Sequence, residues 1–182
     1  ALAAAAEMVL AVERIASAPG AGGSALVGTV GTIEARPGAI NVIPQEVSFT
    51  VDVRSGDDAA RRRATQAMRE DFDAIARRRS VVVTSDVFYE LPAAPCDPAL
   101  QDALAASIVR QGLTVRRLPS GAGHDAMVFP PVCPIAMLFV RCGAGGISHH
   151  PDETMTAGDA EIATAVFLDF LETWIPRAPA PR

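Results

Sequence analysis

Hydrophobic residues recur along the first 90 residues with helical and strand periods in turn. Residues 1–17 and 57–79 repeat apolar side chains at helical spacing, whereas residues 26–35 and 81–89 are rich in β-branched residues. Residues 46–54 alternate strictly between polar and apolar side chains. The apolar positions of this alternation are Val47, Phe49, Val51 and Val53. The pattern predicts the order helix–strand–strand–helix–strand, with two helices on one face of an antiparallel sheet.

This order predicts a ferredoxin-like two-layer α+β sandwich that lacks one strand of the usual split arrangement. The missing strand would precede residue 1. Because the chain opens inside a well-formed helix, we expect the domain to have lost what came before it.

The pattern changes after the proline-rich residues 91–98. Asp97 and Pro98 begin a predicted helix that ends at Gly112, and the apolar run 135–140 predicts a strand covered on both faces of a parallel sheet. Thr156 and Asp159 resemble a capping box that opens a last helix. We expect that helix to bury Ala163, Val166, Phe167, Phe170, Leu171 and Trp174. Helix, buried strand and helix indicate the end of an α/β domain.

Composition narrows the possible functions. The 182 residues are 49% hydrophobic with a net charge of −5, which excludes a disordered chain and argues against nucleic acid as a partner. All 16 cationic residues are arginine, so lysine chemistry is excluded. No apolar run reaches the ~20 residues of a membrane helix. Three widely spaced cysteines indicate reduced thiols and a cytoplasmic location.

The three histidines lie in predicted loops. His124 follows a glycine-rich loop, and His149 and His150 are flanked by a serine, a proline and acidic residues. Such positions suit metal binding or acid–base chemistry, although a single loop histidine is more often structural.

Two other polar side chains allow two interpretations each. Arg54 shares the polar face of its strand with Asp52, which indicates either a surface ion pair or a bidentate clamp for a substrate carboxylate. Asn41 interrupts an apolar stretch, where it either caps a turn or recognises a carbonyl or carboxylate.

Four segments carry a family resemblance: PGAINVIP at 37–44, VSFTVDVR at 47–54, SGAGHDAM at 120–127 and GISHHPDE at 146–153. In this order they resemble the metal-dependent N-carbamoyl-L-amino-acid hydrolases and allantoate amidohydrolases. These enzymes form part of the aminoacylase and carboxypeptidase metallohydrolase clan. The likeness extends from residue 1 to about Trp174.

The resemblance implies roles for individual residues. His149 matches the last metal ligand of a two-metal centre, and Arg54 matches the lid residue that grips the substrate carboxylate. Substrate contacts are implied at Asn41, Arg54, Gly123 and His124, with Asp125 in a supporting position. The resemblance implies no catalytic residue in this chain.

It also implies a domain organisation. Residues 1–92 would be a lid that forms a homodimer, residues 93–176 the C-terminal part of an α/β zinc-hydrolase-type catalytic domain, and residues 177–182 a flexible tail. The substrate would be a small carbamoyl or ureido compound with a carboxylate.

In the complete enzyme, two divalent ions (zinc, manganese or cobalt) would assist hydrolysis of the carbamoyl C–N bond. The family's other metal ligands precede the lid and are not in these 182 residues. We therefore expect the chain alone to bind the metals poorly and to be inactive. Two alternatives stay open, namely an aminoacylase or dipeptidase of the same clan and a non-catalytic dimerisation module.

Overall fold

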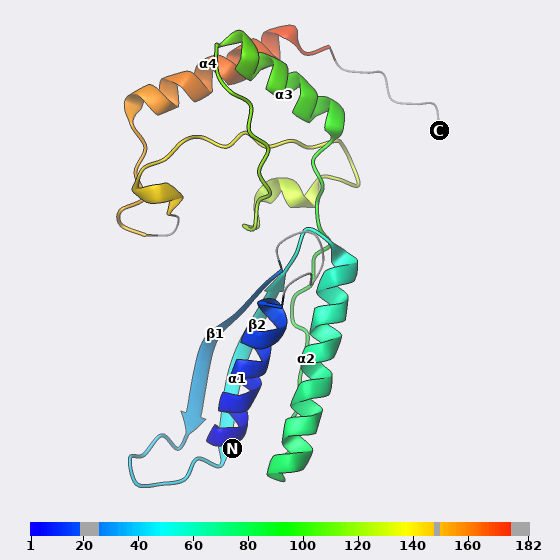
Figure 1. Ribbon diagram of the computed structural model, residues 1–182, viewed down its shortest axis with the longest axis vertical. Helices are drawn as coiled ribbons and strands as arrows, with labels where there is room; N and C mark the ends of the chain where they lie inside the picture. Colours follow the sequence, from blue (N-terminus) through cyan, green and yellow to red (C-terminus); the bar gives the residue numbers. More distant parts are fainter. Residues whose placement is uncertain (19–25, 148–149, 176–182) are drawn as a thin grey trace. The chain divides into compact units, whose positions relative to one another are not determined.

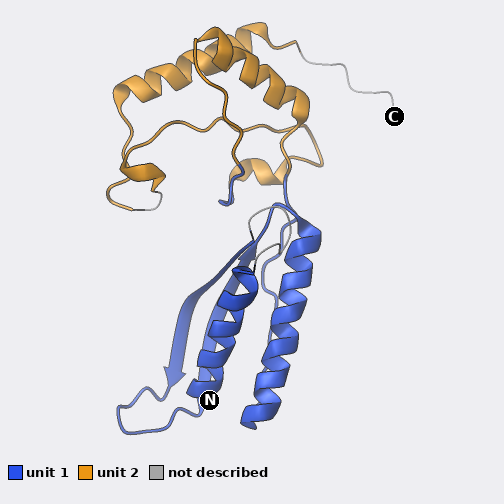
Figure 2. Ribbon diagram, in the orientation of Figure 1, with its two compact units in different colours: residues 1–94, 119–123 blue, residues 95–118, 124–182 orange. Residues whose placement is uncertain are grey.

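The computed structural model describes residues 1–18, 26–147 and 150–175, which fall into two compact units (Figure 1, Figure 2). Unit 1 consists of residues 1–94 and 119–123, and unit 2 of the remainder. Unit 1 contains α1 (Leu2–Ala16), β1 (Val27–Arg36), β2 (Glu46–Arg54) and α2 (Asp58–Arg79). Unit 2 contains α3 (Pro98–Arg110), η1 (Asp125–Val128), η2 (Ala144–Gly146) and α4 (Ala157–Thr173). The described residues therefore confirm the α+β class.

The two strands of unit 1 form an antiparallel hairpin. Val27 is opposite Arg54 and Arg36 is opposite Glu46, with one irregularity between Val30 and Thr32. Along β2, every second side chain is half-buried and the others are exposed, as the sequence pattern predicts. This alternation fixes which side chains face the helices, because a strand turns successive residues to opposite faces.

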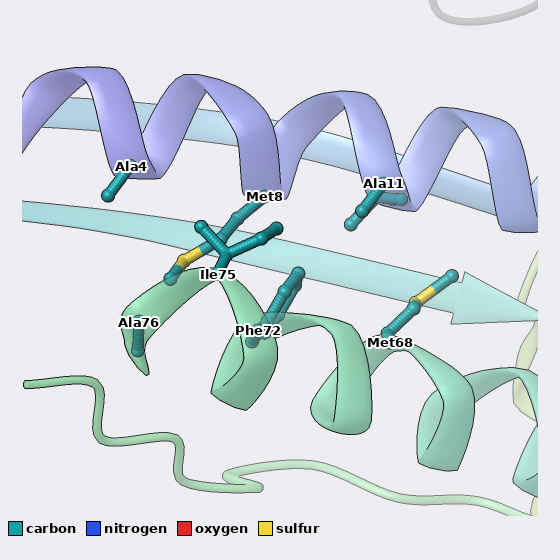
Figure 3. Packing of buried hydrophobic residues seen from close by; sticks show 8 residues of the cluster. Ala4, Met8, Ala11, Met68, Phe72, Ile75 and Ala76 are labelled. Carbon is teal, nitrogen blue, oxygen red and sulfur yellow. The ribbon is translucent and has the colours of Figure 1, made fainter. Parts of the chain in front are cut away.

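Both helices of unit 1 cover the same face of the hairpin. Ala4, Met8 and Ala11 of α1 point toward the side chains that α2 buries (Figure 3). The α2 side chains of this cluster are Met68, Phe72, Ile75 and Ala76, and Val30, Phe49, Val51 and Val53 of the strands pack against it. The Phe49 and Phe72 rings meet edge-on with centroids 5.8 Å apart. The buried cluster thus holds a layer of two helices, α1 and α2, against the hairpin.

Local signals in the sequence set the ends of α2. The Asp57 carboxylate accepts hydrogen bonds from the amides of Ala59 and Ala60 at 2.7 and 3.1 Å, which is the N-cap arrangement. Ser80 ends the helix in the left-handed conformation, with φ of 52°. The basic last turn of α2 pairs with α1 through Arg78, Arg79 and Glu7.

The predicted strand at 81–89 is not a strand in the structure. The described part of the chain has a two-stranded sheet of β1 and β2, and residues 81–89 are not part of it. Val81 and Val83 still pack against the buried cluster, whereas Val82 and Phe88 are 93% and 84% exposed. The prediction of a strand is therefore wrong. β-Branched composition favours a strand, but a strand also needs a neighbour for its backbone hydrogen bonds.

In unit 2, α3 packs against α4. Leu104 and Ser107 of α3 and Val166 and Phe170 of α4 are buried. The helices are also joined by Arg110, whose Nε donates to Asp169 at 2.9 Å. Of the six side chains predicted to be buried, Val166 and Phe170 are buried. The prediction is wrong for Phe167 and Leu171, which are 49% and 58% exposed, and Ala163 and Trp174 are half-buried.

The predicted strand at 135–140 is also wrong. Within the described residues this apolar segment has no strand partner, and only Ile135 is fully buried. The carbonyl of Ile135 accepts a hydrogen bond from the amide of Asp97 at 2.7 Å. The apolar run is therefore a partly buried segment without regular structure, because strand pairing depends on other segments that the run itself does not encode.

Candidate functional site

The carboxyl end of β2 places a guanidinium and a carboxylate on the same exposed face of the hairpin. Asp52 and Arg54 are two residues apart on the polar side of the strand. Arg54 Nε donates to the two carboxylate oxygens of Asp52 at 3.1 and 2.9 Å, and Nη2 donates to Oδ2 at 2.5 Å. The side chains are 52% and 50% exposed. They form a side-on ion pair at the surface of unit 1.

The glycine-rich loop provides a further contact to Arg54. Arg54 Nη1 donates to the backbone carbonyl of Gly121 at 3.3 Å, although 67 residues separate the two positions. Residues 119–123 belong to unit 1, whereas the residues on either side belong to unit 2 (Figure 2). The structure therefore brings together two features that the sequence pointed to separately.

The contacts of Arg54 leave part of its guanidinium available. This group carries five N–H donors. Asp52 takes one on Nε and one on Nη2, and Gly121 takes one on Nη1. Within the described residues, one N–H thus remains on each terminal nitrogen. When Gly121 takes the Nη1 hydrogen that points away from Nη2, the remaining two face the same way and can bind both oxygens of a carboxylate. Hydrogen bonding and charge from Asp52 raise the pKa of Arg54, so the group stays cationic.

Asn41 lies at the opposite end of the hairpin from Arg54. It is exposed in the connection between β1 and β2, beside the fully exposed Ile40. The nine residues of β2 separate the two ends, which at about 3.3 Å per residue corresponds to roughly 26 Å. One small substrate therefore cannot contact Asn41 and Arg54 of the same chain. The substrate-binding role of Asn41 stays a prediction.

Gly123 and His124 lie where the glycine-rich loop meets the short helix η1. Gly123 is exposed and His124 is half-buried. The His124 backbone carbonyl accepts a hydrogen bond from the amide of Met127 at 3.0 Å, which begins the helical turn. Their predicted contacts with substrate stay predictions.

His149, the predicted metal ligand, lies outside the described residues. The base of its loop is described, and there the Gly143 amide donates to the Thr154 carbonyl at 2.7 Å. A Cβ at position 143 would lie 2.6 Å from Thr154 Oγ1, so glycine allows this close approach. The described residues contain no group of three or more His, Cys, Asp or Glu side chains able to hold a metal ion. They therefore do not form a metal site by themselves.

Sequence reasoning missed an ion pair near this loop. Arg141 Nε donates to Asp159 Oδ1 at 2.6 Å, and the Thr156 hydroxyl donates to Asp159 Oδ2 at 2.5 Å. Hydrogen bonds from Thr156 and Arg141 lower the pKa of the Asp159 carboxyl. The Thr156–Asp159 spacing was visible in the sequence, but nothing in it indicated a partner 18 residues before Asp159.

Comparison with known proteins identifies the family. The profile of peptidase family M20/M25/M40 matches residues 6–173. The chain belongs to peptidase family M20/M25/M40. Within this family it is 34% identical over 165 residues to the N-carbamoyl-L-amino acid amidohydrolase of Geobacillus stearothermophilus, covering 91% of this chain and 39% of that protein. It is 36% identical over 137 residues to the allantoate amidohydrolase of Escherichia coli (strain K12), covering 75% of this chain and 33% of that protein.

A solved structure agrees with the M20/M25/M40 assignment. The amidase of the hydantoinase/carbamoylase family from Burkholderia vietnamiensis matches with a TM-score of 0.82 and 34% identity, covering 94% of this chain and 41% of that one. The resemblance to the N-carbamoyl amino acid hydrolases and allantoate amidohydrolases is confirmed. The chain spans less than half the length of these relatives. Among its described helices, none combines the length and hydropathy needed to cross a bilayer.

Proposed function

We propose that this chain is part of a metal-dependent amidohydrolase that cleaves the carbamoyl or ureido C–N bond of N-carbamoyl amino acids or allantoate-like compounds. Its relatives of this family include proteins named for both activities. The observation that carries the proposal is the Arg54 guanidinium, held beside the glycine-rich loop with an N–H left on each terminal nitrogen. A substrate of either class has a carboxylate that fits this pair of donors.

The role of the described residues is to bind and orient the substrate. Two parallel N–H···O bonds from Arg54 would fix the carboxylate in one plane, and charge-assisted bonds of this kind contribute about 1.5–3 kcal/mol each. A fixed carboxylate also fixes the position of the remaining atoms of a small substrate. Such orientation lowers the activation barrier of the hydrolysis that follows binding. The divalent ions need several ligands in fixed geometry, which the described residues do not hold.

In this proposal unit 1 is the lid, and its hairpin and two helices belong to a ferredoxin-like sandwich. Val30, Phe49, Val51 and Val53 of the hairpin pack on the same buried cluster as both helices, which supports a two-layer arrangement of sheet and helices. The lid would also form a homodimer. Because Asn41 cannot reach the substrate of its own Arg54, we assign it to a substrate bound by the second protomer.

The proposal is tested by the substrates of the full-length enzyme. We expect release of ammonia from an N-carbamoyl-L-amino acid or from allantoate, and we expect no turnover by these 182 residues alone. Arg54→Lys should raise KM at least tenfold, because lysine cannot bind both carboxylate oxygens in one plane. Arg36→Lys is the matched control, since Arg36 forms a similar exposed pair with Glu34 on β1.

Two outcomes would contradict the proposal in different ways. Turnover of N-acyl amino acids or dipeptides in place of carbamoyl compounds would favour an aminoacylase or dipeptidase. A metal-free dimer without turnover of any of these substrates would favour a dimerisation module.

A further inference from the structure

The side-on pair between Asp52 and Arg54 does more than neutralise a surface charge. We propose that Asp52 is a positioning residue, which holds the Arg54 guanidinium so that its two remaining N–H groups meet a single planar carboxylate. The inference rests on the proposed function of Arg54. The inference adds Asp52 to the proposed carboxylate site and explains why that site would select carboxylates over other anions.

The geometry of the pair supports this role. Asp52 engages the Nε edge of the guanidinium through both of its oxygens, with contacts of 3.1, 2.9 and 2.5 Å. A side-on contact of this kind fixes the plane of the group as well as its position. The Gly121 carbonyl then takes one N–H of Nη1. Held on two sides, the guanidinium can present its last two donors in only a narrow range of directions.

A second arginine on the same sheet shows what an ordinary pair looks like. Arg36 and Glu34 have the same spacing on β1, and Nε and Nη2 donate to the carboxylate at 3.2 and 3.4 Å. These contacts are longer than those of Arg54, and the side chains are 62% and 63% exposed. Within the described residues, no backbone carbonyl receives a hydrogen bond from the Arg36 side chain. The hydrogen bonds between Arg54 and Asp52 are therefore shorter than those between Arg36 and Glu34. Of the two arginines, only Arg54 also donates to a loop that is far away in the sequence.

Neutralisation by Asp52 also sets which anions can bind. An uncompensated guanidinium attracts any anion, including sulfate and chloride, through its charge. The pair of Arg54 and Asp52 has little net charge and offers directed hydrogen bonds, which favour a ligand that uses both N–H groups in one plane. Asp52 thus weakens the binding of anions in general to Arg54 and makes the site selective for a carboxylate.

Kinetics of the full-length enzyme test this role. Asp52→Asn removes the charge and one acceptor, so we expect KM for an N-carbamoyl-L-amino acid to rise about tenfold while kcat changes less than about threefold. Inhibition by sulfate should become stronger in the same variant. Asp52→Glu, which keeps the carboxylate, should recover most of the wild-type KM and weaken sulfate inhibition again. Glu34→Gln, in the matched pair, should leave both quantities unchanged.

The variants separate this inference from the proposed function. If Arg54→Lys raises KM but Asp52→Asn leaves both KM and sulfate inhibition within twofold of wild type, Asp52 has no positioning role and the function of Arg54 stands. If Arg54→Lys leaves KM unchanged, the proposed site itself is wrong. Should Asp52→Asn fail to fold, as judged by circular dichroism, Asp52→Ser measured in the same way decides the question.

Discussion

Replacing Phe72 with alanine tests the packing that organises unit 1. Phe72 is 8% exposed in the cluster between α1, α2 and the hairpin, and its ring meets Phe49 edge-on. Removing a buried phenylalanine side chain costs about 3–5 kcal/mol, through lost burial and the cavity that remains. A domain is stable by only about 5–15 kcal/mol. The substitution should therefore remove a large share of the stability of unit 1.

Urea denaturation followed by far-UV circular dichroism measures this loss, with hydrogen exchange of α1 peptides to locate it in unit 1. Phe88→Ala is the control, because Phe88 is 84% exposed and its loss should change the free energy of unfolding by less than about 0.5 kcal/mol. Phe49→Ala and the double variant complete a cycle, in which the coupling should be about 0.5–1.5 kcal/mol. A cost below about 1 kcal/mol for Phe72→Ala, or additive effects in the cycle, would show that α2 does not pack on the hairpin in this way.

Three further predictions concern caps, close packing and pH. Asp57→Ala should cost about 1 kcal/mol of stability in urea denaturation by removing the N-cap of α2, whereas Asp73→Ala, in the exposed middle of the helix, should not. Gly28→Ala should cost about 1–3 kcal/mol, because its Cβ would lie 2.9 Å from Ala16 Cβ; Gly121→Ala, with open space around it, is the neutral control. The lowered pKa of Asp159 means that its contribution is present above the ordinary carboxyl pKa of about 4 and is lost as pH falls through the lowered value. The free energy of unfolding of Asp159→Asn, measured as the pH is lowered below about 4, should therefore fall less steeply than that of the wild type. An equal decrease in both proteins would contradict the ion pair with Arg141.

Features of the fold that depend on residues close together in the sequence were predictable. Helical spacing and the caps at Asp57, Asp97 and Thr156 located three of the helices closely, and the strict alternation of residues 46–54 gave both the strand and its buried face. The two wrong strands, at 81–89 and 135–140, have suitable residues but no partner in the described chain. Strand pairing is a relation between segments, so one segment cannot reveal it.

The same limit applies to the site. The spacing of Asp52 and Arg54 predicts both on one face of the strand, and the surface ion pair that this allows is present in the structure. The contact of Arg54 with Gly121 joins positions 67 residues apart, so no pattern among neighbouring residues predicts it. The exposure of Phe167 and Leu171 was missed for a related reason, because helical periodicity shows which side chains share a face but not whether anything covers it.

The assignment of residues 119–123 to unit 1 has a practical consequence for anyone dissecting the molecule. The polypeptide passes between the units after residues 94, 118 and 123, so a single cut cannot separate them cleanly. A fragment that stops at Ala94 would retain the hairpin and both of its helices but would leave Gly121 behind. In such a fragment Arg54 would keep Asp52 and lose its backbone acceptor, so measurements on the fragment would not describe the guanidinium of the intact protein.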